Sequence, residues 1–216
     1  MPRVIHPMLA TLVDKPFNND EWLFEIKWDG YRAITYLENG ALRFVSRNQN
    51  ELTGAYPELQ PIAQLIRAQT AVLDGEIVAF DEQGRSSFSL MQQRTGAREG
   101  GRWIRQTRDD IPIAYYAFDL LYLDGYNLMQ IALERRKELL RSILVQDDIL
   151  RFSDHYAGRG EDLFHAAAGR QLEGIIGKLR SSRYVQKRSR DWLKMKIVKR
   201  HEFVIGGYTD PRGSRE

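Results

Sequence analysis

Residues 22–32 read Trp-Leu-Phe-Glu-Ile-Lys-Trp-Asp-Gly-Tyr-Arg, a pattern typical of a β-strand that runs into a tight turn. Large apolar side chains recur at every second position from Trp22 to Trp28, so they share one face of the strand. Glu25 and Lys27 lie together on the opposite face. The dipeptide Asp29-Gly30 suits a turn, and the sequence therefore predicts an amphipathic strand followed by a reversal of the chain.

Lys27 is the unusual residue of this stretch, because a lysine on an inner strand beside a glycine turn is costly to bury. Two interpretations account for it. Either Lys27 forms a salt bridge with Glu25 or Asp29, or its amine is a nucleophile. From this stretch alone, the salt bridge is the favoured interpretation.

Composition indicates a folded globular protein of one large domain or two small ones. The chain has 216 residues, of which 43% are hydrophobic and 11% aromatic. It contains no cysteine, which excludes disulfides and thiol chemistry, leaves His, Asp and Glu as the strong metal ligands, and fits a cytosolic protein. The sequence shows neither the apolar core of a signal peptide nor a run long enough to span a membrane.

The formal net charge of +3 is unevenly distributed along the chain. Residues 180–216 contain 11 Lys and Arg against 4 Asp and Glu, whereas residues 1–179 contain 21 against 25. A basic end on an acidic body is explained equally well by contact with a polyanion and by a solvated basic surface.

The pattern of apolar residues predicts an α+β fold with antiparallel pairing. Residues 33–37 and 41–45 flank Asn39-Gly40, the strongest short-range signal for a β-hairpin. Proline breaks regular structure in residues 1–20, and Gly, Arg and Asp indicate a loop over residues 96–110. Helices are predicted over residues 57–68, 86–94, 131–144 and 160–170, and further strands over 71–80, 112–123, 173–179, 192–198 and 202–208.

Polar groups interrupt the apolar strands at five further places. Each has an ordinary structural explanation on its own, such as a strand end, an edge bulge or a core aromatic residue. Gly75, between two carboxylates on one strand face, permits another group to approach closely. Two lysines on one face of a later strand repel each other unless an anion lies between them or the face is solvated. The five places are Ser46-Arg47, Asp74-Gly75-Glu76, Phe118-Asp119, Glu173 to Lys178, and Trp192 to Lys196.

Taken together and in this order, these segments resemble the motifs of the covalent nucleotidyltransferases, which comprise DNA ligases, RNA ligases and mRNA capping enzymes. The resemblance extends over residues 4–208. Lys27-Trp28-Asp29-Gly30-Tyr31-Arg32 resembles the nucleophile motif of the family. The later motifs are matched by Ser46-Arg47, Asp74-Gly75-Glu76, Tyr116-Ala117-Phe118-Asp119, Glu173-Gly174-Ile175-Ile176-Gly177-Lys178 and Trp192-Leu193-Lys194-Met195-Lys196.

Within the family, the chain is most similar to bacterial ATP-dependent DNA ligases, in particular the ligase module of end-joining ligase D proteins. The segments that carry this similarity are Trp22 to Ala33, Arg190 to Lys194 and Glu202 to Tyr208. The resemblance implies an ATP-grasp-like nucleotidyltransferase domain over residues 1–200, with antiparallel sheets flanked by helices. It implies that residues 201–216 are a linker and the start of a truncated C-terminal OB-fold domain, the rest of which is absent.

The implied function is that of the catalytic domain of an ATP-dependent DNA ligase. Lys27 would attack the α-phosphate of ATP to form lysyl-AMP, and the AMP would pass to the 5′-phosphate of a nick or break that is then sealed. The implied setting is non-homologous end joining of double-stranded DNA in the bacterial cytoplasm, associated with the nucleoid, with a Ku-type end-binding partner. The alternatives are an RNA ligase, a GTP-dependent capping-type enzyme, or a non-catalytic nucleic-acid-binding module.

The resemblance also assigns ligands to the site around Lys27. ATP and Mg²⁺ or Mn²⁺ are the implied cofactors, with Glu173 and Glu76 as metal ligands, since carboxylate oxygens suit Mg²⁺. Lys194 and Lys196 would hold the α-phosphate and spread its developing charge.

The remaining implied contacts surround the base, the sugar and the DNA. Glu25 would accept a hydrogen bond from the adenine amino group, and Phe118 would stack on the base. Arg32 and Glu76 would contact the ribose hydroxyls, and Arg47 would bind a phosphate at the nick. The implied nucleotide-binding residues are therefore Glu25, Ile26, Lys27, Arg32, Arg47, Glu76, Phe118, Glu173, Lys194 and Lys196.

An amine attacks only when it is neutral, and free lysine, with a pKa of about 10.4, is almost fully protonated at neutral pH. Desolvation and nearby cations lower the pKa of a lysine. Lys194, Lys196 and a bound metal are candidates for these cations, whereas Glu25 and Asp29 would oppose them. The sequence leaves open how the Lys27 amine becomes neutral.

Overall fold

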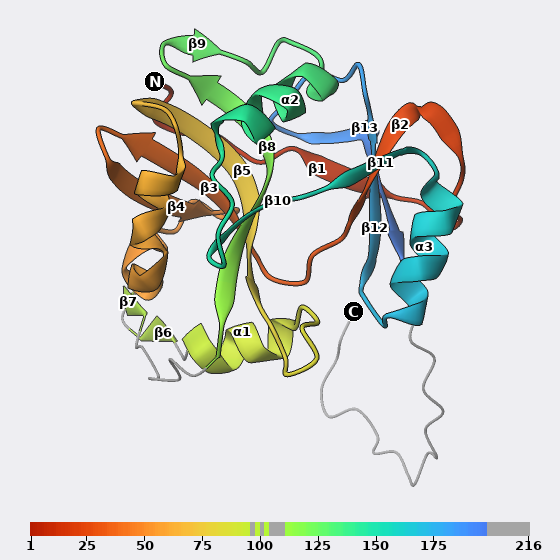
Figure 1. Ribbon diagram of the computed structural model, residues 1–216, viewed down its shortest axis with the longest axis horizontal. Coiled ribbons are helices and arrows are strands. Elements are labelled where there is room, and N and C mark those ends of the chain that lie inside the picture. The colour runs from red at the N-terminus through yellow and green to blue at the C-terminus, as the bar shows by residue number, and fades with distance from the viewer. Residues whose placement is uncertain (96–97, 100–101, 104–110, 198–216) are drawn as a thin grey trace, which may run out of the picture.

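The computed structural model describes residues 1–95, 98–99, 102–103 and 111–197, and it contains two larger β-sheets that lie side by side as two lobes (Figure 1). No helix in these ranges is long and apolar enough to cross a membrane. The predictions for residues 198–216, including the linker, the start of an OB-fold domain and the strand over 202–208, lie outside the described residues.

The first sheet has the strand order β10-β8-β5-β3-β4, with β9 added beside β8. Its neighbouring strands are antiparallel except for β10 and β8, which are parallel. The strands are β3 (Tyr31–Glu38), β4 (Ala41–Ser46), β5 (Thr70–Ala79), β8 (Ile113–Leu123), β9 (Tyr126–Asn127) and β10 (Leu150–Phe152). Around this sheet lie the 3₁₀ helices η1 (Thr53–Ala55) and η2 (Pro57–Leu65), and the α-helices α1 (Phe88–Thr95) and α2 (Leu133–Ile143).

The second sheet has the order β1-β13-β12-β2-β11 and carries α3 (Gly160–Gly169) on its outer side (Figure 1). It is antiparallel apart from the parallel pair β1 and β13. Its strands are β1 (Leu9–Leu12), β2 (Asn19–Ile26), β11 (His155–Gly158), β12 (Gly174–Leu179) and β13 (Arg188–Lys196). A separate hairpin is formed by β6 (Arg98–Glu99) and β7 (Arg102–Trp103).

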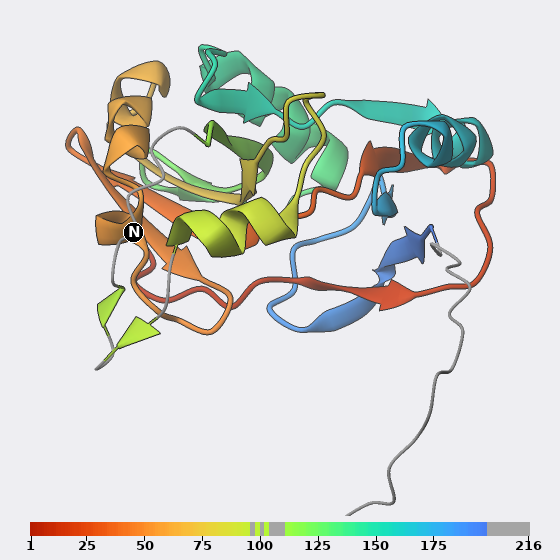
Figure 2. The same ribbon diagram turned by 90° about the horizontal axis from the view of Figure 1, so that it is seen from below.

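The predicted α+β class with mainly antiparallel pairing is confirmed, including the hairpin at Asn39-Gly40, where both residues have positive φ. The predicted helix over residues 57–68 is a 3₁₀ helix over Pro57–Leu65, because Pro61 inside it has no N–H to donate. The expectation that proline breaks all regular structure in residues 1–20 is wrong, since β1 lies between the prolines as an edge strand. Figure 2 shows this N-terminal segment crossing from one lobe to the other.

The strand over residues 22–28 ends two residues earlier than predicted, at Ile26. Both of its faces are buried, because Phe24 packs with α3 on one side while Leu23 packs between the two sheets. Glycine is needed at position 30 because the backbone of Ile77 lies close to it, and not because φ is positive. A Cβ there would lie 2.1 Å from the carbonyl oxygen of Ile77. Gly75 permits the close approach predicted for it, because a Cβ added at this position would lie 2.4 Å from the Tyr115 ring.

The apolar core between the sheets is where the two lobes are joined. Residues from both sheets and from the N-terminal segment contribute to it. Leu23 and Trp192 belong to the second sheet, and Ile34 and Phe118 to the first. The strands that carry the predicted site motifs therefore meet along one buried seam.

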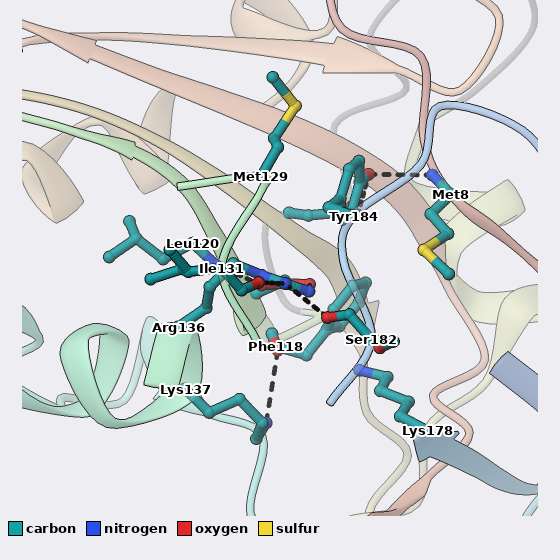
Figure 3. Close-up of polar contacts among 12 residues, drawn as sticks. Met8, Phe118, Leu120, Met129, Ile131, Arg136, Lys137, Lys178, Ser182 and Tyr184 are labelled. Carbon is teal, nitrogen blue, oxygen red and sulfur yellow. Dashed lines mark hydrogen bonds and ion pairs between the residues drawn. The ribbon is translucent and has the colours of Figure 1, made fainter. Parts of the chain in front are cut away.

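A buried ion pair ties α2 to the first sheet. The Arg136 guanidinium donates to both oxygens of Asp119 on β8, at 2.7 and 2.9 Å, and both side chains are fully buried. Arg136 also donates to the backbone carbonyls of Ile131 and Ser182, as Figure 3 shows. Every charge of the pair is thereby satisfied in a region closed to water.

We expect Asp119→Ala to lower the free energy of unfolding by about 3–5 kcal/mol, because it leaves the buried Arg136 cation without its counter-ion. The matched control is Glu138→Ala, which breaks the exposed Arg135–Glu138 pair on the same helix and should cost less than about 1 kcal/mol. Equilibrium unfolding in urea measures both variants. A loss for Asp119→Ala no greater than that of the control would contradict the assignment.

Candidate functional site

A pocket of about 110 Å³ opens at the seam between the two sheets, where the ends of β2 and β12 face β5 and β8. Six of the residues predicted for the site line it: Glu25, Ile26, Lys27, Arg32, Glu76 and Phe118. The other residues in its wall are Ala10, Trp28, Ile176, Lys178 and Trp192.

Lys27 follows directly on β2, and its backbone N–H donates to the carbonyl of Gly174 at 3.0 Å. Its ammonium group forms an ion pair with Glu173, and Lys196 lies 3.4 Å from the other oxygen of that carboxylate. The salt-bridge interpretation therefore named the wrong partners, Glu25 and Asp29. The pairing of β2 with β12, which sets Ile26 against Ile175, brings Glu173 to Lys27 across 146 residues of sequence.

Asp29 accepts a hydrogen bond from the start of a helix and does not pair with Lys27. Its Oδ2 accepts a hydrogen bond from the backbone N–H of Phe88, the first residue of α1, at 3.2 Å. A carboxylate is favourable there because the first N–H groups of a helix have no partner within the helix.

Glu25 is 2% exposed and accepts hydrogen bonds from three side chains. Lys137 of α2 donates to its Oε1 at 2.8 Å, while Lys178 of β12 and the Ser153 hydroxyl donate to Oε2 at 2.9 and 3.1 Å. Burial alone would raise the pKa of Glu25, but Lys137 and Lys178 outweigh it and hold the pKa below its usual value. Glu25 is therefore an ionised acceptor in the pocket wall.

Arg32 is paired with Asp74. Its Nε and Nη2 donate to the two carboxylate oxygens of Asp74 at 2.5 and 2.6 Å, and the Tyr184 hydroxyl donates to the same carboxylate at 2.6 Å. The pKa of Arg32 is raised, because Asp74 outweighs the effect of burial. The guanidinium lies 4.6 Å from the centre of the Phe118 ring, which places both side chains at one end of the pocket.

Glu76 has neither a hydrogen bond nor an ion pair with any described residue, although it lines the pocket. Burial raises its pKa to about 8, against the lowering influence of Arg32 and Lys27. Asp74 and Glu173 also raise the pKa, so Glu173 is an electrostatic neighbour of Glu76. A cation beside these carboxylates would favour their ionised forms.

The two glutamates fit the predicted metal site. No group of three or more His, Cys, Asp or Glu side chains able to hold a metal occurs among the described residues. Mg²⁺ is commonly held by one or two carboxylates together with substrate phosphates and water. Glu76 and Glu173, both near Lys27, match that donor set.

Basic side chains gather beside Lys27, outside the pocket wall. The pKa of Lys194 is lowered, mainly by burial and then by the positive charges of Lys196, Arg188, Lys27 and Arg47. Arg47 is exposed, and it has no hydrogen bond or ion pair with any described residue. The predicted shared face of Trp192, Lys194 and Lys196 is confirmed, since Trp192 lies in the core between the sheets while Leu193 and Met195 pack with α3.

Sequence reasoning missed Lys137, which lies in a mostly charged run from Glu134 to Arg141 within the predicted helix over residues 131–144. Arg136 and Lys137 are in fact buried. The signal was present, because Leu133, Arg136, Lys137 and Leu140 are spaced three and four apart and so share one face of α2. Ser153, which donates to Glu25, was also not predicted. Asp74, Lys178 and Trp192 lie in the matched motifs, but no role of their own was predicted for them.

The comparisons with known proteins agree with this geometry. The family model described as the ATP-dependent DNA ligase domain matches residues 7–196. The multifunctional non-homologous end joining protein LigD of Pseudomonas aeruginosa is 42% identical over 217 residues, covering 100% of this chain and 24% of that protein. The SPbeta prophage-derived DNA ligase-like protein LigB of Bacillus subtilis is 30% identical over 206 residues, covering 95% of this chain and 72% of that protein.

Two solved structures extend the similarity to the fold. Mycobacterial DNA ligase D complexed with ATP and MES has a TM-score of 0.75 at 34% identity, over 89% of this chain and 60% of that one. The ligase domain of LigD from M. tuberculosis has a TM-score of 0.74 at 33% identity, over 89% and 59%. The chain spans only about a quarter of the length of the LigD relative from Pseudomonas. With its matching motifs, fold and pocket, the chain belongs to the ATP-dependent DNA ligase domain family.

Proposed function

We propose that this chain activates DNA ends for ligation by first forming a covalent lysyl-AMP. The Lys27 Nζ attacks the α-phosphorus of ATP, a phosphoramide bond forms, and the bond to the bridging oxygen breaks to release pyrophosphate. The observation that carries the proposal is the position of Lys27, at the boundary between a closed pocket and a cluster of basic side chains. A nucleotide bound across that boundary would have its α-phosphate next to the amine.

The closed end of the pocket suits the nucleoside. Glu25, held ionised, would accept a hydrogen bond from the amino group of adenine. Phe118 would stack on the base, and Ile26 forms part of the wall. Arg32 and Glu76 would contact the ribose hydroxyls, and Glu76 has an acceptor that no described residue occupies.

The open end suits the phosphates. Lys194 and Lys196 bring positive charge to the side of Lys27 from which a triphosphate would approach. Cations fixed in place before the reaction stabilise charge that develops on the phosphate oxygens in the transition state. Glu173 brings negative charge to the same amine, so the Lys27 ammonium must lose both its proton and this ion pair before it attacks.

Glu173 and Glu76 would hold Mg²⁺ or Mn²⁺. The ion would neutralise part of the negative charge of the triphosphate. This assignment uses two carboxylates that already lie around Lys27.

The later steps would take place on DNA. The 5′-phosphate at a nick or break attacks the lysyl-AMP to give DNA-adenylate, and the 3′-hydroxyl then seals the strand and releases AMP. Arg47, exposed beside the basic cluster, would bind a phosphate at the nick. The names of the bacterial LigD relatives support a role in non-homologous end joining. A Ku-type protein at the DNA ends and a location near the nucleoid belong to the same proposal and rest on the resemblance of the sequence motifs alone.

Incubation of the chain with ATP and Mg²⁺ is expected to add one AMP to its intact mass, and Lys27→Ala is expected to show no adduct, because the attacking amine is gone. Lys27→Arg is the matched control for charge, since it keeps a cation beside Glu173 but cannot act as the nucleophile. Omission of Mg²⁺ should also abolish the adduct. An AMP adduct of equal yield in Lys27→Ala would remove Lys27 from its role.

The rate of adduct formation should fall on the order of 10²-fold in Lys194→Ala, because a fixed cation is lost from the phosphate end of the site. Lys196→Ala should have a smaller effect, since that side chain is half exposed. Arg141→Ala, which removes an exposed cation from α2, serves as the control and should leave the rate unchanged. Initial rates with α-labelled ATP measure all three, and equal rates in Lys194→Ala and the control would contradict the assignment.

The same assay separates the rival activities. Labelled GTP in place of ATP tests for a capping-type enzyme, and nicked RNA in place of nicked DNA tests for an RNA ligase. DNA binding without any covalent nucleotide would indicate a non-catalytic module.

A further inference from the structure

Lys137 reaches the base end of the pocket from α2, which is otherwise outside the site. Its ammonium group donates to Glu25 Oε1 at 2.8 Å, to the Ser153 carbonyl at 3.0 Å and to the Phe118 carbonyl at 3.3 Å. Figure 3 shows the side chain directed from α2 at the Phe118 carbonyl. An ammonium has three N–H donors, so each finds an acceptor and the group is fixed in direction.

Apart from Ser153, Lys137 contacts Glu25 and Phe118, and these are the two residues proposed to recognise the base. It holds the carboxylate of Glu25 and the backbone of Phe118 at once. Lys137 is itself 1% exposed and does not line the pocket. It can therefore act on a bound nucleotide only through Glu25 and Phe118.

The hydrogen bonds around Glu25 leave room for one more donor. A carboxylate has about four acceptor positions, two on each oxygen. Oε2 accepts from Lys178 and Ser153, and Oε1 accepts from Lys137 alone among the described residues. The Ser153 hydroxyl is itself oriented, because it accepts from Trp28 Nε1 at 3.1 Å while it donates to Glu25. The remaining position on Oε1 is adjacent to the contact with Lys137.

We propose that Lys137 is a positioning residue for base recognition, which fixes Glu25 as an acceptor and thereby selects nucleotides that present an exocyclic amino group. This inference rests on the proposed function. A base with a carbonyl or a hydrogen at that position would face the free acceptor of Glu25 without donating to it, and would lose a charge-assisted hydrogen bond. The preference for adenine would then depend on a helix residue that never touches the nucleotide.

The test compares ATP with purine riboside 5′-triphosphate, which has the same sugar and phosphates but lacks the 6-amino group. Rates of AMP-type adduct formation are measured at limiting concentrations of each nucleotide. The parent chain should prefer ATP on the order of ten- to hundred-fold, the factor expected for one hydrogen bond to a charged group. Lys137→Met should lose most of this preference, through a fall in the ATP rate, while the rate with the analogue changes less than about threefold.

A merely structural role would lower both rates in parallel, so an unchanged ratio in Lys137→Met overturns the proposal. Lys137→Arg should keep part of the preference for ATP, since it retains donors and charge.

If Lys137→Met does not fold, as judged by urea unfolding, Lys137→Gln applies the same test with a neutral donor. Arg135→Met, which removes an exposed cation from the same helix, is the matched control and should leave the ratio unchanged. Absence of any adduct in the parent chain would instead refute the proposed function.

Discussion

A buried carboxylate in contact with two lysines is the interaction on which the rest of the structure depends. Glu25 on β2 is bound by Lys137 of α2 and Lys178 of β12, so one charge fixes three elements. Asp119 with Arg136, and Asp74 with Arg32, repeat the arrangement nearby. A buried charge is tolerated only when it is paired and hydrogen-bonded, and removal of one partner is far more costly than loss of a surface pair. The side chains at the seam between the sheets are therefore held in place by paired charges.

The two ends of the site differ in whether their charged groups have partners. At the base end each described charge has a partner, and Glu25 offers one defined acceptor. Glu76, proposed to contact the ribose, has no partner among the described residues, and at the phosphate end Lys194 lies among other cations. A charged group without a partner costs free energy in the free protein. The same group contributes most to the free energy of binding when a ligand of opposite charge binds beside it. Lys27, whose only ion pair with a described residue is the one with Glu173, lies where the two ends meet.

Local patterns predicted much of the fold, and six of the ten residues predicted to bind the nucleotide line the pocket. The alternation in β13 correctly placed Trp192 and Lys194 on one face, and the Asp-Gly-Glu motif correctly indicated a close approach at Gly75. The partner of Lys27 could not be found in this way, because Glu173 is brought to it by strand pairing across 146 residues. Lys137 was overlooked for a different reason. A charged residue on the apolar face of a helix resembles surface charge until its buried partner is known, and that partner lies on another element.

The central claim is that Lys27 becomes covalently bonded to AMP, and the most direct measurement is to locate that bond. After the chain is incubated with ATP and Mg²⁺, peptide mapping by tandem mass spectrometry should place AMP on Lys27 alone. Lys194 and Lys196 are suitable internal comparisons, because they lie beside the same phosphate position and carry the same functional group. AMP found on either of them, with Lys27 unmodified, would contradict the account.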